Sequence, residues 1–282
     1  MRIERHQIDE TRLSEMKGDL DGDYKRLLDT LQTAKRYPGN LSQLISASKI
    51  VAAQELLFDT RSSRGRQALH LAAPASASLF DARMARPDNS VTVALEERGG
   101  LVTYTSPPDE STVTVGTWVR GFYFGAVARD RAAMDLLCRT DPEALRGSST
   151  RSPDYMYLYA KSLRDYHTRQ WDRIVENMMA AFDATDPERP DVYDKDWALH
   201  LHVPQLEVLI YAVTRDARFA DALRRAVELH KKYWSSMEDF RMQSFEGLIS
   251  IPLSGLARIG LDQGLRFDVE SPYIPRELLG QF

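Results

Sequence analysis

Through most of the chain, apolar residues recur at spacings of three and four, which is the period of an amphipathic α-helix. Pro74 falls inside the third of these stretches, where a proline is expected to kink or break a helix. The predicted helices span residues 9–36, 41–58, 64–84, 114–130, 131–139, 153–168, 170–184, 195–213, 217–234 and 247–263.

One short stretch departs from this pattern. Val91, Val93 and Leu95 alternate with other residues, and the glycines of "RGG" permit a turn before a second run that starts at Leu101. The alternation predicts one small β-hairpin near 90–106. The predicted fold class is therefore all-α with this single hairpin.

From Ser152 onward the predicted helices come in pairs, with short connections and a spacing of about 40 residues. Such pairs are typical of an α-solenoid with tetratricopeptide-like packing, although no strict repeat consensus is present. The chain has no low-complexity segment or long linker. We therefore expect a single mainly helical domain over residues 1–282, with a weak internal boundary near 85–110.

Composition narrows the class of protein. With 43% apolar residues the chain can form a substantial core, and its net charge of −4 gives no basic face for a nucleic acid. An acidic protein more plausibly meets a basic partner. The charged start "MRIERHQIDE" lacks the apolar core of a signal peptide, no apolar run is long enough for a bilayer, and Cys138 is the one cysteine. These features predict a cytoplasmic protein without a membrane partner.

Motifs of the common enzyme classes are missing from the sequence: there is no GxxxxGK[ST] loop, GxGxxG turn, HExxH helix or GxSxG elbow. The best metal-like feature is "ALHLHVPQLE", with His200 and His202. Residues two apart on a helix point in nearly opposite directions, so these histidines share a ligand face only if Pro204 breaks the helix. A metal-dependent enzyme that uses His200, His202 and His230 remains the less favoured alternative.

The segment "FDATDPERPDVYDKDW" is rich in carboxylates. It does not fit a calcium loop, because Glu188 stands where such a loop needs glycine. Two interpretations stay open: a solvated connection between helices, or an acidic and aromatic surface that docks on a basic protein. The candidate partner-binding residues are Asp186, Glu188, Asp191, Tyr193, Asp194 and Trp197.

The stretch "AVELHKKYWS" concentrates a histidine, two lysines, a tyrosine and a tryptophan. Ala226, Val227, His230, Tyr233 and Trp234 share one face of a predicted helix, which favours packing over chemistry. We expect His230 at the edge of the core.

Four stretches, taken in order, resemble the immunity protein 49 family: "RIERHQIDE", "GTWVRGFYFGAVARDRAAMDLLC", "AVELHKKYW" and "GLISIPLSGLARIGLDQGLRFDVESPYIPRELL". The most distinctive combination is the His-Lys-Lys-Tyr-Trp helix end followed by Glu270, Ser271, Tyr273 and Pro275. The resemblance spans nearly the entire chain.

This resemblance implies a mainly α-helical, non-enzymatic protein that binds and neutralises a cognate bacterial toxin domain encoded by an adjacent gene. It implies no catalytic residues, no metal and no cofactor, and it leaves the toxin unidentified. The alternative from another class is a helical-repeat adaptor that holds a peptide in a concave groove.

Overall fold

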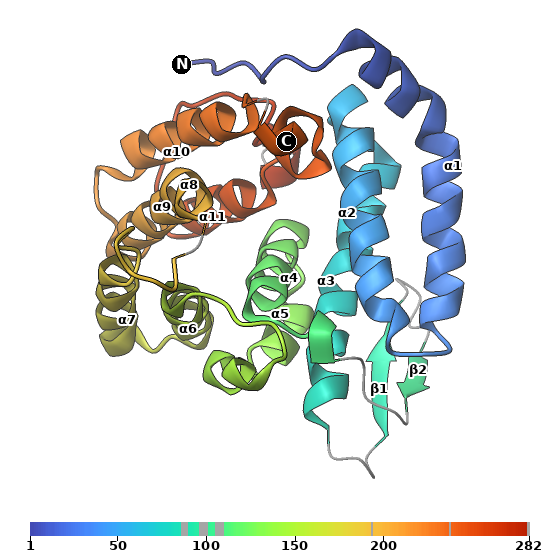
Figure 1. Cartoon of the computed structure of the whole chain (residues 1–282), viewed down its shortest axis with the longest axis horizontal. Coiled ribbons are helices and arrows are strands. Elements are labelled where there is room, and N and C mark those ends of the chain that lie inside the picture. The colour runs from blue at the N-terminus through green and yellow to red at the C-terminus, as the bar shows by residue number, and fades with distance from the viewer. Residues whose placement is uncertain (86–89, 96–100, 105–109, 193, 237, 281–282) are drawn as a thin grey trace.

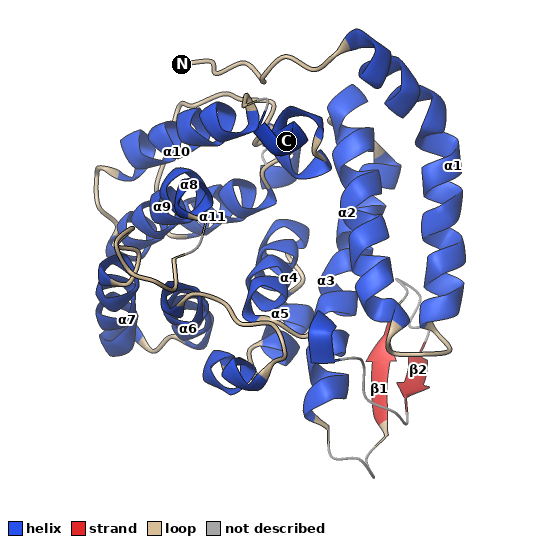
Figure 2. Cartoon of the chain, viewed as in Figure 1, coloured by secondary structure: helices blue, strands red, loops and turns tan. Residues whose placement is uncertain are grey.

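A computed structural model of the chain describes residues 1–85, 90–95, 101–104, 110–192, 194–236 and 238–280. Helices dominate the described part (Figures 1 and 2). The α-helices are α1 (Glu10–Ala34), α2 (Asn40–Phe58), α3 (Ser63–Met84), α4 (Val115–Ala128), α5 (Arg131–Leu137), α6 (Asp154–Thr168), α7 (Trp171–Asp183), α8 (Lys195–Trp197), α9 (Val203–Thr214), α10 (Phe219–Trp234) and α11 (Ile251–Asp262). A π-helical turn, Ala198–His202, joins α8 to α9, and the 3-10 turns are Glu110–Thr112, Pro142–Gly147, Glu238–Gln243, Phe245–Gly247 and Arg276–Leu279.

The all-α class is confirmed, and most helices begin and end within a few residues of the predicted bounds. Of the kink or break expected at Pro74, the break is wrong, because α3 runs without interruption from Ser63 to Met84, and the kink stays a prediction. More than half of the residues in this helix are buried, and it packs against α2, α4 and α5. Tertiary packing on several sides therefore outweighs the hydrogen bond that the proline removes.

Two short strands interrupt the helical pattern of the chain. β1 (Val91–Ala94) pairs antiparallel with β2 (Leu101–Tyr104), in the register Val91 to Tyr104. β1 contacts α3, and the Tyr104 hydroxyl donates a hydrogen bond to the carbonyl oxygen of Ala34 at the end of α1. The turn predicted at "RGG" lies outside the described residues. The strands thus rest against the α1–α3 side of the molecule, as Figure 2 shows.

The helices form two groups around α4. In Figure 1, α1, α2 and α3 lie on one side, α6 to α11 lie on the other, and α4 and α5 stand between them. α4 contacts α3, α5, α6 and α11, and α9 contacts α7, α10 and α11. A solenoid is not shown, because α4 packs directly on α11, whereas solenoid repeats contact only their sequence neighbours.

The beginning and end of the described chain are tied together. The Ile3 amide donates to the Glu270 carbonyl oxygen at 2.8 Å, and the Glu270 amide donates to the Met1 carbonyl oxygen at 2.9 Å. Next to this parallel bridge, Nδ1 of His6 lies 2.7 Å from the Tyr273 hydroxyl. Buried Tyr273 in turn packs edge-on against His230 of α10, at 4.7 Å between ring centroids. This side of the core therefore needs both ends of the described chain.

Two smaller expectations can be compared with the structure. Cys138 is buried, as predicted, and burial raises the pKa of its thiol to about 12, so the group stays protonated and serves as an apolar side chain. None of the described helices is long and apolar enough to cross a bilayer. The single-domain assignment stays a prediction.

Candidate functional site

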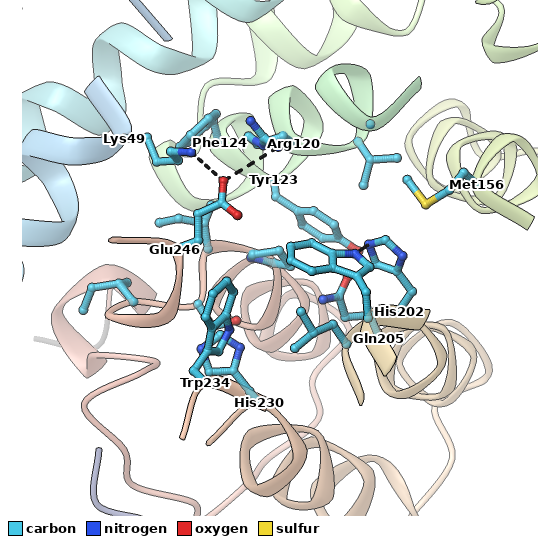
Figure 3. Close-up of a pocket in the computed structure, with 18 of the residues that line it drawn as sticks. Lys49, Arg120, Tyr123, Phe124, Met156, His202, Gln205, His230, Trp234 and Glu246 are labelled. Carbon is cyan, nitrogen blue, oxygen red and sulfur yellow. Dashed lines mark hydrogen bonds and ion pairs between the residues drawn. The ribbon is translucent and has the colours of Figure 1, made fainter. Parts of the chain in front are cut away.

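A pocket of about 330 Å³ lies where α2, α4, α6, α8 to α10 and the start of α11 approach one another (Figure 3). Such a volume is at the lower end of the range for small-molecule sites. Most of the lining is apolar, and its aromatic side chains are Tyr123, Phe124, Tyr155, Trp197, Trp234 and Phe245. They come from α4, α6, α8, α10 and the Phe245–Gly247 turn, so the tertiary fold assembles the pocket.

One edge of the pocket is charged. The Lys49 ammonium lies 2.5 Å from Oε1 of Glu246, and a guanidinium nitrogen of Arg120 lies 3.9 Å from the same oxygen (Figure 3). Burial raises the pKa of Glu246, but the charges of Arg120 and Lys49 and the lysine hydrogen bond outweigh it, so the pKa is lowered. Two cations share one carboxylate, which leaves this edge with an excess of positive charge.

His202 is fixed as a neutral imidazole in the pocket wall. Nε1–H of Trp197 donates to Nε2 of His202 at 3.0 Å, and Nδ1 of His202 lies 2.9 Å from the Tyr155 hydroxyl. Because Nε2 accepts, Nδ1 carries the proton. Burial lowers the pKa of His202 to about 4, which agrees with this neutral form. Both ring nitrogens are thus engaged within the protein.

The π-helical turn places His202 in this wall. It adjoins Pro204 in the first turn of α9, where the missing proline N–H is tolerated. His200, two residues before His202, instead contacts the Asp196 carboxylate at 2.9 Å. Over the described residues, no group of three or more histidine, cysteine or acidic side chains is placed to hold a metal. The two histidines therefore serve separate local contacts.

His230 and Trp234 of α10 also line the pocket, and each is 4% exposed. In the described part of the chain, neither His230 Nε2 nor Trp234 Nε1 has a hydrogen-bond partner. Burial lowers the pKa of His230 to about 3; a backbone hydrogen bond with Gly247 acts in the opposite direction, and the charges of His6 and Arg5 add to the lowering. An unpaired buried polar group lowers the free energy of unfolding by about 1–3 kcal/mol. Both nitrogens can still form a hydrogen bond with a molecule bound in this part of the pocket.

The acidic segment predicted as a partner surface is divided by the structure. Asp191 is a structural residue: its Oδ2 accepts a hydrogen bond from the Asp154 amide at 2.9 Å. Pro153 precedes α6 without a side-chain cap, so Asp191 caps this helix from a distant loop. The hydrogen bond from the Asp154 backbone is the main reason that the pKa of Asp191 is lowered.

Other members of the predicted surface point outward. Asp186 and Asp194 are exposed and accept hydrogen bonds from nearby backbone amides, and the Glu188 side chain is 87% exposed, 3.9 Å from Lys195. Trp197 is partly buried and packs edge-on against Trp234. Tyr193 lies outside the described residues.

The structure thus brings Asp194 and Trp197 together at the pocket and leaves Asp186 and Glu188 outside it. The sequence reasoning missed Lys49, Arg120 and Glu246, because no local pattern links three charged residues on three separate elements.

By its fold and site, the chain is an all-α protein with an aromatic-lined pocket that is charged at one edge. The family model described as Immunity protein 49 matches residues 59–278, and the chain belongs to this family. No curated protein and no solved structure matches the chain.

Proposed function

We propose that this chain binds and neutralises a cognate bacterial toxin domain as a stoichiometric, non-enzymatic inhibitor in the cytoplasm. Membership of the immunity protein 49 family carries the proposal. Both ring nitrogens of His202 are engaged within the protein and His230 packs against Tyr273, which is consistent with a role in binding.

The exposed part of the acidic segment is the proposed first contact with the toxin. Asp186, Glu188 and Asp194 present carboxylates to solvent, and they suit a toxin domain with a basic surface. Trp197 sits beside Asp194 at the pocket and offers an aromatic side chain at the inner end of this surface. Asp191 is left out of the proposed contact, because it caps α6.

Co-expression tests the proposal. The chain is produced together with the toxin domain encoded beside its gene, and growth and co-purification are followed. Rescued growth and a complex of fixed stoichiometry support the proposal, and a non-toxic or non-binding neighbour overturns it.

The acidic contact has its own test. Within the described residues, the Glu188 side chain makes one distant ion pair, so we expect Glu188→Lys to retain the fold while association with a basic toxin slows. Asp29→Lys, which makes the same change in net charge at an exposed position of α1, serves as the control. An association rate that Glu188→Lys leaves unchanged at low salt removes this segment from the interface.

The pocket favours a second candidate function, that of an adaptor which binds a short peptide or small molecule. Its volume, its aromatic walls and its charged edge are what such a ligand would require. Gly116 lines the pocket, and a Cβ atom there would meet only Thr114 Oγ1, at 3.7 Å. Gly116→Leu therefore adds a larger side chain to the pocket wall, with its Cβ atom in ordinary van der Waals contact. Loss of toxin binding in this variant would show that the toxin uses the pocket. Unchanged binding would support a different ligand for the pocket.

A further inference from the structure

The outer side of α7 carries a row of exposed apolar side chains. Trp171, Val175 and Met179 are 46%, 41% and 50% exposed. Their spacing of four residues makes them neighbours along one line of the helix. A second apolar row, which includes Ile174 and Met178, is buried. One buried row is enough to anchor a helix, so the exposed row is available for another surface.

Acidic residues border this row. Asp183 is exposed and continues the line four residues after Met179, and the exposed carboxylates of Asp172 and Glu176 lie alongside it. In the described part of the chain, none of these three acids makes an ion pair. Arg173 is the one basic residue in the sequence of α7, and its charge acts on Asp165, whose pKa it lowers against the larger effect of burial. The charged side chains of α7 that lie along the apolar row are therefore acidic.

The row is also partly fixed before any partner arrives. Trp171 packs edge-on against Tyr166 of α6, with ring centroids 6.1 Å apart and an interplanar angle of 80°. An aromatic ring that is already positioned loses less conformational entropy on binding. Tryptophan is also the residue type most enriched among the side chains that dominate binding energy at interfaces.

We infer that the row Trp171–Val175–Met179 is the central contact for the toxin domain. The row binds in an apolar groove of the toxin domain that is edged by lysine or arginine. This inference rests on the proposed function. A helix that lays an apolar row into a groove is a common recognition mode, and the acidic border supplies complementary charge. Because α7 ends at Asp183, where the acidic segment begins, the two surfaces are continuous in sequence.

The apolar part is tested with matched pairs of variants. Trp171→Ala and Met179→Ser are compared with Tyr37→Ala and Met84→Ser, whose side chains are 49% and 50% exposed elsewhere. Binding to the purified toxin domain encoded beside the gene is measured by biolayer interferometry. We expect Kd to rise about 30-fold for Trp171→Ala and about 5-fold for Met179→Ser. Both control variants should stay within about two-fold of the wild type.

The charged border is tested separately. Glu176→Lys is expected to lower the association rate constant about 10-fold at low salt, and the difference should shrink as salt is added. Asp29→Lys on α1 makes the same change in net charge at another exposed position and should have a smaller effect.

The outcomes separate the two proposals. If the wild type binds and protects but the α7 variants bind equally well, the inference about α7 is overturned and the proposed function stands. If the wild type neither binds nor protects, the proposed function falls, and the inference falls with it.

Discussion

Helices α7 and α10 are both amphipathic, but they bury their large side chains to different extents. α10 buries eight residues along its length, including Trp234, which is 4% exposed. α7 buries only Ile174, Met178 and Ala181 and leaves Trp171 46% exposed. Residues whose types suggest chemistry are thus buried on α10, whereas α7, which carries no such motif, retains an open apolar surface.

The largest expected effect separates the two tryptophans. Trp234→Ala removes a buried indole that packs against His230 and Trp197, so we expect the free energy of unfolding to fall by about 3–5 kcal/mol. Trp171→Ala should lower it by no more than about 0.5 kcal/mol, because the ring is largely in solvent. Urea denaturation followed by far-UV circular dichroism measures both. Equal losses for the two variants would contradict the burial of Trp234 and the exposure of Trp171.

Much of this contrast can be predicted from the sequence. The periodic pattern predicted α10 and its buried face, including His230, and the four resembling stretches predicted the family. The degree of burial on α7 could not be predicted, because periodicity shows that a helix has an apolar face but not how much of it a neighbour covers.

The pocket was beyond prediction for a related reason. Lys49, Arg120 and Glu246 lie on α2, α4 and the turn before α11, and only the packing of α4 between the two helix groups brings them together. The continuity of α3 at Pro74 illustrates the same limit, since tertiary packing keeps the helix unbroken where local propensity favours a break.

The next effect concerns pH and the buried histidines. The pKa of His230 is about 3 and that of His202 about 4 in the folded state, whereas an unfolded histidine has a pKa near 6.5. Between these values the unfolded chain binds more protons, so stability is complete above pH 6.5 and is lost as the pH falls. At pH 5 we expect a loss of about 2 kcal/mol for each histidine.

Urea denaturation at pH 7.5 and pH 5.0 measures this loss. His230→Gln should show a smaller difference between the two pH values than the wild type, whatever its absolute stability. His70→Gln, at an exposed position on α3, should leave the difference unchanged. A wild-type chain with equal stability at both pH values would contradict the burial of these imidazoles.

The smallest expected change in stability distinguishes Asp191 from Glu188 within the acidic segment. Asp191→Ala removes the carboxylate that caps α6, so we expect a loss of about 1 kcal/mol in the free energy of unfolding. Glu188→Ala should leave stability unchanged, since its side chain is 87% exposed. Thermal unfolding by calorimetry distinguishes the pair. A larger loss of stability for Glu188→Ala than for Asp191→Ala would contradict the capping role of Asp191.

The bridge between Ile3 and Glu270 has a consequence for the timing of assembly. During translation, Ile3 leaves the ribosome well before its hydrogen-bonding partner Glu270 has been polymerised. His6 likewise waits for the Tyr273 hydroxyl. A nascent chain that stops before residue 270 cannot close this side of the core, which therefore forms only after synthesis has passed that point.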